Sequence, residues 1–344
     1  MNKKLIALFL AVAMLFTMIG CTSGNDSSDK DTAGTETTDN GTTQDNDNAD
    51  DTTLPSDMRI AYAAVTTSLA PWVIAMYNNM VEMCDANGWE LTSYDGNGDV
   101  NTQTEQIDNI IANGDVDLVV LFPVDSEVGV GYVEDLNAAG IPVITMGSDV
   151  TEEGQSGVLC YVGPNQKDLV SYGANYIMDN LGTEEELNYV VLSGFEGQFD
   201  YVQREAAVNE FFADMPYNQL AVKYCGAGRD TALEETATLL TTYDDIDFIF
   251  ALSDEFALGA IQAIEEAGKT GEITVVSLEI FSEGIQAILD GSMSVSVLMR
   301  SDKVVDKLEE VLNALVAGEK VEYMQASDIV GVTIDNANDI EAEY

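Results

Sequence analysis

The chain of 344 residues contains no histidine and has few basic residues. Without histidine, Ser-His-Asp and Cys-His mechanisms are excluded, and so are most catalytic zinc sites. The 13 lysines and arginines stand against 61 aspartates and glutamates, which gives a formal net charge of −48. Because proteins bind nucleic acid through a basic surface, this balance excludes nucleic acid as a partner. The long-range field also disfavours anionic ligands.

Cysteine is also scarce, with four residues in the chain. No two of them form a C-x-x-C pair, which argues against a zinc site and against a disulfide framework. Cys84 falls on an apolar helical stripe, and Cys160 and Cys225 lie in or beside expected strands. We therefore expect buried thiols at these three positions, no metal ion and no cofactor.

The segment Asp95 to Asp99 reads D-G-N-G-D, like the start of a calcium loop. An EF-hand loop needs Gly at its sixth position and Glu at its twelfth, where this chain has Val100 and Gln106. The pattern therefore favours a Gly/Asn/Asp turn, with calcium as the alternative.

The N-terminus predicts export. Met1 to Lys4 is basic, and the apolar run from Leu5 to Ile19 is too short for a comfortable membrane span. Met18 to Cys21 resembles a bacterial lipobox, which makes residues 1–21 a lipoprotein signal peptide and Cys21 the lipidated new N-terminus. A plain secretory signal with an incidental cysteine is the alternative. Lipid chains on Cys21 would anchor the protein to the outer face of the cell membrane.

Residues 22–57 contain no aromatic residue and are nearly all Thr, Asp, Asn, Ser and Gly. Such a segment buries too little apolar surface to offset the loss of chain entropy, so we expect a disordered acidic tether. The folded body would begin at Met58.

Two almost wholly apolar runs, Val116 to Val124 and Ile141 to Met146, follow amphipathic helical patterns. Strands of this kind are buried on both faces, as in a parallel sheet flanked by helices. Loops at the carboxyl ends of such strands line the ligand crevice. We therefore expect Pro123 to Asp125 and Gly147 to Asp149 to lie at a binding site.

The body repeats one plan twice, which predicts two Rossmann-like α/β lobes. In the first half, strands are expected at 59–65, 90–94, 116–124 and 141–146, and helices at 71–87 and 103–112. In the second half, strands are expected at 188–193, 220–224, 247–252 and 273–278, with helices at 201–215, 230–242 and 255–267. The late strands 294–299 and 329–333 are expected to cross between the lobes.

Three motifs carry a family resemblance: Gly140 to Thr145, Gly114 to Ser126, and Ser253 to Ala260. With them, residues 58–334 resemble the periplasmic sugar-binding proteins of the ribose and galactose type, the solute receptors of ABC importers. The resemblance implies a type I fold with two lobes joined by three crossovers. Residues 58–162 plus 300–327 would form the N-terminal lobe, and 163–299 plus 328–344 the C-terminal lobe.

In the first half, the resemblance points to the segments after strands one and four. Family members carry Asn-Pro and aromatic residues after the first strand, where this chain has Ala-Pro and then Trp72. Trp72 either stacks on a sugar ring or packs in the core. Ribose-type members have Asp-Arg after the fourth strand, where this chain has Gly147 and Ser148, with Asp149 next. The arginine contact is missing, and Ser148 and Asp149 are the candidate replacements.

In the second half, the resemblance points first to charged and polar residues. Arg204 occupies the place of a ligand-binding arginine, and Glu279 the place of a carboxylate that accepts from ring hydroxyls. Ser253 and Asp254 stand where the family has Asn-Asp, so Ser253 replaces the contacting amide. A surface ion pair is the alternative for Arg204.

Three further second-half residues complete the candidate set. Met299 replaces a glutamine of the family in the last crossover. Phe195 and Phe199 follow the first strand of this half and would either line the opposite side of the pocket or pack within the lobe.

We therefore expect a monomeric solute-binding lipoprotein that clamps an uncharged polar guest, most simply a monosaccharide, by hinge closure. The partners would be ABC permease transmembrane subunits and the membrane. A receptor feeding a sensor kinase or chemoreceptor is an alternative within the binding class. A carboxylate-dependent hydrolase using Glu279 with Asp254 or Asp200 is an alternative from another class. The lost Asp-Arg pair leaves an aldose, a modified sugar, a polyol or a furanosyl molecule open as the ligand.

Overall fold

The computed structural model describes residues 53–68, 71–226 and 228–343. The expected signal peptide, its Cys21 and tether residues 22–52 lie outside this part of the chain. No helix within the described ranges combines the length and apolar character needed to cross a bilayer.

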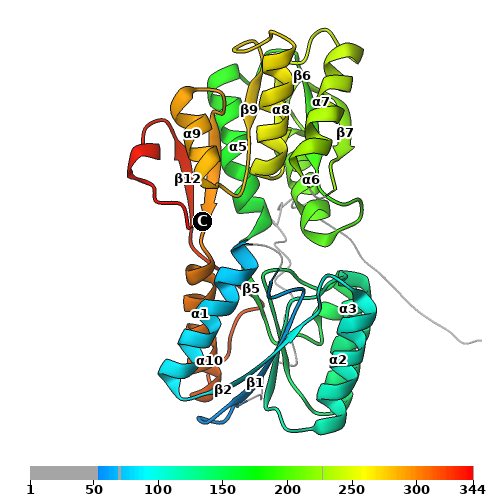
Figure 1. Ribbon diagram of the computed structural model, residues 1–344, viewed down its shortest axis with the longest axis vertical. Coiled ribbons are helices and arrows are strands. Elements are labelled where there is room, and N and C mark those ends of the chain that lie inside the picture. The colour runs from blue at the N-terminus through cyan, green and yellow to red at the C-terminus, as the bar shows by residue number, and fades with distance from the viewer. Residues whose placement is uncertain (1–52, 69–70, 227, 344) are drawn as a thin grey trace, which may run out of the picture. The chain divides into compact units, whose positions relative to one another are not determined.

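The first lobe is built on a six-stranded sheet of order β11-β5-β4-β3-β1-β2, and every neighbouring pair in it is parallel (Figure 1). Its strands are β1 (Arg59–Ala64), β2 (Glu90–Asp95), β3 (Leu118–Leu121), β4 (Val143–Met146), β5 (Tyr161–Gly163) and β11 (Met324–Ala326). Helices on both faces bury these strands: α1 (Pro71–Asn87) and α10 (Ser301–Val316) on one side, α2 (Val100–Asn113) and α3 (Ser126–Ala138) on the other, with α4 (Glu152–Gln155) beside α3.

The second lobe repeats the plan with the order β12-β10-β9-β8-β6-β7. Its edge strand β12 is antiparallel to β10, and the other pairs are parallel. The strands are β6 (Leu187–Ser193), β7 (Tyr217–Tyr224), β8 (Phe248–Ala251), β9 (Thr274–Val276), β10 (Val295–Met299) and β12 (Ile329–Thr333). The helices are α5 (Gln166–Leu181), α6 (Phe199–Phe212), α7 (Arg229–Thr242), α8 (Asp254–Glu266), α9 (Ser282–Asp290) and the short η1 (Ala337–Asp339).

Strand β3 shows how local chemistry sets an element boundary. All four of its residues are buried, as the apolar run predicted, but the strand ends at Leu121 rather than Val124. Buried Gln103 then satisfies the backbone in place of a neighbouring strand, because its Nε2 donates to Phe122 O and its Oε1 accepts from Val124 N. The Asp125 carboxylate caps α3 by accepting from the N–H groups of Glu127 and Val128.

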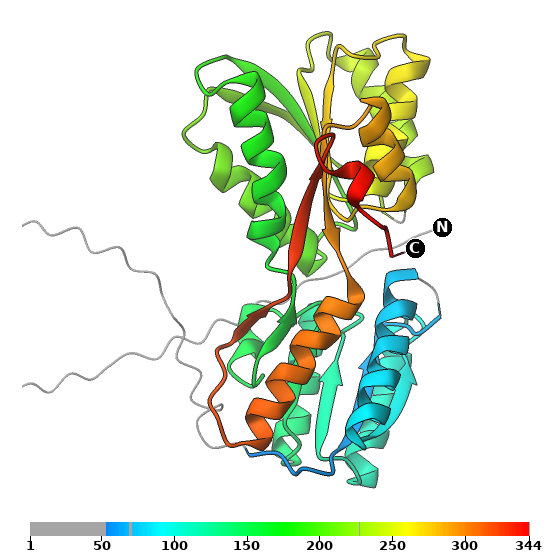
Figure 2. The same ribbon diagram turned by 90° about the vertical axis from the view of Figure 1, so that its left-hand side faces the viewer.

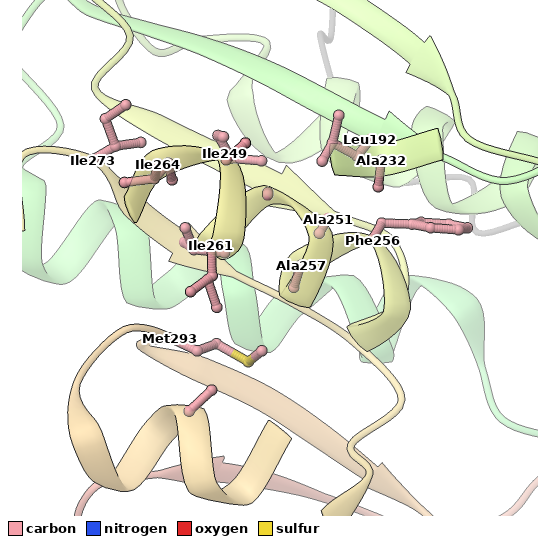
Figure 3. Packing of buried hydrophobic residues seen from close by; sticks show 14 of the residues in the cluster. Leu192, Ala232, Ile249, Ala251, Phe256, Ala257, Ile261, Ile264, Ile273 and Met293 are labelled. Carbon is pink, nitrogen blue, oxygen red and sulfur yellow. The ribbon is translucent and has the colours of Figure 1, made fainter. Parts of the chain in front are cut away.

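The core of the second lobe is densely apolar around α8. Figure 3 shows Phe256, Ala257, Ile261 and Ile264 of this helix among side chains from the sheet and from α7. Burial of a large side chain such as Phe256 or Ile261 contributes about 1.5–3 kcal/mol, and this packing fixes the position of α8 and of its N-cap residue Ser253.

The chain passes between the sheets three times, after β5, after β10 and after β11 (Figure 2). β10 and β12 were expected to cross between the lobes, but both pair along their whole length inside the second sheet. Their backbone groups are satisfied by that ladder, so the crossings fall just beyond their ends.

The folded body begins earlier than the predicted Met58. Leu54 is buried in the core of the first lobe, and its backbone N–H donates to Leu315 O. Trp89 Nε1 donates to the carbonyl of Ser56. The single leucine of the expected tether therefore supplies enough apolar surface to attach its end to α10.

Candidate ligand site

Polar side chains from both lobes meet at the carboxyl ends of the strands, in a group that we call the interlobe site. Ser148 and Asp149 follow β4 of the first lobe. Asp200 and Arg204 lie in the first turns of α6, and Glu279 follows β9, all in the second lobe. Ser148 lies close enough to Asp200 for its hydroxyl to lower the pKa of that carboxyl, so the two lobes approach each other here.

Arg204 is the buried cation of this site, with a side chain that is 4% exposed. Its Nε donates to Gln166 Oε1 over 2.8 Å and its Nη1 to Leu252 O over 2.9 Å. Its guanidinium also lies 5.3 Å from the Tyr201 ring centroid. These contacts come from α5, from the residue after β8 and from the preceding turn of α6 itself, so the guanidinium of Arg204 is held in a fixed orientation.

Glu279 completes the fixation of Arg204. Nη2 of Arg204 donates to Glu279 Oε1 over 2.6 Å. Burial alone would lower the pKa of Arg204, but Glu279, Tyr201 and Asp200 together outweigh it and the pKa lies well above its ordinary value. Glu279 has a backbone φ of +66°, an unfavourable conformation for a residue other than glycine. Such strain persists where surrounding contacts impose it, and it concentrates at functional sites.

Asp200 has a different environment from the other carboxylates of the site. Its Oδ1 is buried and has no hydrogen-bond partner among the described residues. Burial raises the pKa of Asp200 to about 6, although nearby Arg204 and the Ser148 hydroxyl act in the opposite direction. A buried carboxylate oxygen without a donor is costly, so this atom is a strong candidate for a ligand contact.

Asp149 is bound on both oxygens by its own lobe. Oδ1 accepts from Thr145 Oγ1 over 2.7 Å and from Val150 N over 2.8 Å. Oδ2 accepts from Tyr323 Oη over 2.5 Å and from Gln155 Nε2 over 3.3 Å. Burial raises its pKa despite these bonds. Of the two residues expected in place of the missing Asp-Arg pair, Asp149 is thus fixed within its own lobe, whereas the Ser148 hydroxyl acts on the Asp200 carboxyl of the opposite lobe.

Ser253 and Asp254 lie at the start of α8, and both are buried. Asp254 Oδ1 accepts from Ser296 Oγ over 2.7 Å, and Oδ2 accepts from Phe281 N over 3.2 Å. Burial raises the pKa of Asp254 to about 7. Its carboxylate therefore joins α8 to β10 and to the start of α9, where the helix dipole favours a negative charge.

Trp72 packs against the apolar cores of both lobes, so it spans their junction. Its ring meets Phe122 edge to face at a centroid distance of 6.4 Å, and its Nε1 is buried without a partner among the described residues. The Phe122 ring in turn lies against Gly147, whose φ of +82° and lack of a side chain allow that approach.

The three remaining candidates lie in the second lobe. Phe195 is 56% exposed and lies beside Gly226. Phe199 is the first residue of α6 and is half-buried. Met299 is buried at the end of β10 and belongs to the apolar cluster that also contacts Trp72.

The D-G-N-G-D segment forms a turn. Asp95 accepts from the hydroxyls of Thr67 and Ser68 and from Asn97 N. Asp99 caps α2 by accepting from Thr102 N. Within the described ranges, no three acidic or cysteine side chains gather in an arrangement that could hold a metal ion.

Sequence reasoning did not include four residues of this group among the ligand-site candidates: Asp200, Gln166, Tyr161 and Tyr323. Asp200 could have been found, because it lies four residues before Arg204 and so shares its helix face. Tyr323 donates to Asp149 from a distant segment, and Tyr161 Oη donates to Gly147 O and Pro164 O. These two contacts depend on tertiary folding and leave no local signal.

The family model described as periplasmic binding protein domain matches residues 60–320. This chain belongs to that family. The family prediction and the prediction of two α/β lobes are thereby confirmed. The ribose import binding protein of Salmonella typhimurium is 24% identical over 265 residues, which cover 77% of this chain and 87% of that protein. The xylitol-binding protein of Mycolicibacterium smegmatis is 28% identical over 264 residues, covering 75% and 72% of the two chains. These relatives are binding proteins by name.

Solved structures show the same fold. A solute-binding protein from Bacillus halodurans with bound myo-inositol superimposes with a TM-score of 0.74 at 23% identity, covering 84% of this chain and 99% of that one. A periplasmic ribose transporter protein from Conexibacter woesei also has a TM-score of 0.74, at 20% identity, covering 83% and 95%. At these identities the likeness concerns the fold.

Proposed function

We propose that this protein is the extracytoplasmic solute-binding lipoprotein of an ABC importer, and that it binds a monosaccharide or a related polyol between its lobes. The observation that carries this proposal is the interlobe site itself. Arg204 supplies a fixed guanidinium and Asp200 a buried carboxylate oxygen without a donor, and Trp72, at the junction of the lobes, has an indole N–H without an acceptor among the described residues. A hydroxyl group donates and accepts, so hydroxyl-rich solutes suit such a set.

The family supports this assignment. Ribose import binding proteins of several bacteria, a xylitol-binding protein and a fructose import binding protein are among the relatives. Structures of the same fold carry D-allose, myo-inositol and L-arabinofuranose. The ligand of this chain would belong to the same chemical range.

Binding would act through hinge closure. Because Trp72, Ser148 and Asp149 belong to one lobe and Arg204, Asp200 and Glu279 to the other, a ligand that contacts both lobes stabilises the arrangement in which they approach. The three crossings are the hinge in this scheme, and permease subunits would recognise the liganded arrangement. Lipidation at Cys21 would keep the protein at the outer face of the membrane.

A thermal-shift screen of the full chain tests the proposal. D-ribose, D-allose, xylitol, myo-inositol, L-arabinose and their amino derivatives form the panel. A ligand at about 100 times its Kd stabilises the folded state by about 2.7 kcal/mol, so a true ligand raises the melting temperature in a concentration-dependent way. If no small polar solute produces such a rise, the proposed function is rejected.

A second measurement tests the anchor. Metabolic labelling with a clickable fatty acid should tag the chain in bacterial cells, and Cys21→Ser should abolish the tag and release the protein from the membrane fraction. An unlabelled wild-type chain would show that the cysteine is incidental.

A further inference from the structure

Negative side chains outnumber positive ones in the interlobe site. Asp200, Glu279 and Asp149 act together on their neighbours, and Arg204 is the cation among them. Asp254 adds a fourth carboxylate, which is fully buried and close enough to Glu279 for the two to repel. The strong field of a chain with net charge −48 reinforces this imbalance.

Within this group, the other carboxylates have protein donors. Arg204 binds Glu279, donors of the first lobe bind both oxygens of Asp149, and Ser296 with Phe281 N binds Asp254. Arg204 already uses Nε, Nη1 and Nη2 on Gln166, Leu252 and Glu279. Asp200 forms no ion pair among the described residues, although Arg204 and the Ser148 hydroxyl act on it, and its Oδ1 is the unsatisfied carboxylate atom.

Resting on the proposed function, we infer that the ligand carries a protonated amine that binds Asp200 Oδ1, which makes an amino sugar or an amino polyol the ligand class. An ammonium group supplies three donors and the missing positive charge, whereas a neutral hydroxyl supplies one donor and leaves the charge in place. Charge-assisted hydrogen bonds are about twice as strong as neutral ones. This inference differs from the uncharged guest expected from the sequence.

Trp72 fits the same ligand from the other lobe. Its Nε1 is a buried donor without an acceptor, and it requires an oxygen rather than an ammonium. An amino sugar carries both an ammonium group, which can donate to the Asp200 carboxylate, and hydroxyl or ring oxygens, which can accept from the Trp72 indole. A simple alkylamine has no oxygen for Trp72.

Matched ligand pairs test this inference by calorimetry on the full chain at pH 7. D-glucosamine is compared with D-glucose, D-galactosamine with D-galactose, and each amino sugar with its neutral N-acetyl form. We expect at least one amino sugar to bind about tenfold or more tightly than both neutral partners, a difference of about 1.4 kcal/mol. Asp200→Asn should remove this preference, and Asp214→Asn, the same change at an exposed position, should retain it.

The outcomes separate the two proposals. Neutral sugars that bind as well as or better than their amino counterparts overturn the amine inference and leave the proposed function standing. Binding by neither class, together with a failed solute screen, rejects both. An amine preference that survives Asp200→Asn also overturns the inference, because another group would then hold the amine.

A measurement without ligand adds an independent check. If Asp200 lacks a partner, Asp200→Asn should raise the melting temperature of the ligand-free chain at pH 8, and this gain should shrink toward pH 4, where the folded-state carboxyl is protonated and no charge is buried. A lower melting temperature of Asp200→Asn at pH 8 would show that the carboxylate is a structural partner of Arg204 and would overturn the inference.

Discussion

Glu279 Oε1 accepts from Arg204 Nη2 over 2.6 Å, and the backbone of Glu279 is strained, with a φ of +66°. The strain and the contact belong together, because the left-handed turn after β9 directs the carboxylate toward α6. The pair also sets the charge that Arg204 offers to a ligand.

Removing either partner should weaken binding of any solute identified in the screen. We expect Arg204→Ala and Glu279→Ala each to raise the Kd by more than tenfold, because each loses a charge-assisted bond and leaves its partner uncompensated. Calorimetry provides the measurement, and circular dichroism verifies the fold. Arg229→Ala, which breaks a half-exposed ion pair with Glu255, is the matched control and should leave the Kd unchanged. Unchanged affinity in both site variants would remove these residues from the binding site.

Gly147 predicts a steric effect beside the site. An added Cβ would lie 2.7 Å from the Phe122 ring, and the φ of +82° disfavours any side chain. Gly147→Ala should lower the free energy of unfolding by about 1–3 kcal/mol, as measured by urea denaturation. Gly131→Ala is the control, because nothing lies within 4 Å of its added Cβ and it lies within α3. That change should stabilise by about 0.5–1 kcal/mol, and equal effects of the two substitutions would contradict the assignment.

Asp254 predicts a pH dependence of stability. Its pKa of about 7 lies above the ordinary value of 3.8, so the folded state binds the proton more tightly than the unfolded state does. The corresponding stabilisation is present below about pH 4 and is lost as pH rises through 7. We expect Asp254→Asn to flatten the decrease in melting temperature between pH 5 and pH 8. An unchanged slope would show that the Asp254 carboxylate stays ionised throughout.

The start of α10 carries a distant cap. Glu343 Oε2 accepts from Ser301 N over 2.7 Å, and Asn79 Nδ2 donates to Ser301 Oγ over 2.9 Å. Glu343→Ala should therefore destabilise the fold by about 0.5–2 kcal/mol in urea denaturation. Glu341→Ala, which removes an equal charge nearby, should cost about 0.5 kcal/mol or less. Similar losses in both variants would assign the effect to charge rather than to the cap.

The apolar runs and the helical spacing of apolar residues in the sequence predicted the parallel strands in the core of each lobe. Runs such as 116–124 identified β3, because strands buried on both faces are apolar throughout. The short strands β5 and β11 escaped detection: they contain three residues each, and Met324 and Ala326 of β11 are exposed. The helices α5, α9 and α10 were also not assigned, although Asn165 is a recognisable cap of α5.

Only part of the site could be predicted from the sequence. Arg204 and Glu279 were found by family resemblance, and the structure joins them directly. Whether a carboxylate faces a ligand or the protein interior depends on contacts between distant segments. Asp254 turns to Ser296 and Asp149 to Tyr323, whereas Asp200 keeps an unsatisfied oxygen, and no local pattern distinguishes the three.

Trp72 lies where the two lobes meet, whereas Trp89, the second tryptophan of the chain, is buried within one lobe and bound to Ser56 O. Intrinsic fluorescence of the unlabelled protein therefore contains one emitter that senses lobe movement and one that serves as an internal standard. A Trp89→Phe variant would leave a single natural optical probe at the junction, so that stopped-flow emission could time the conformational step without an attached dye.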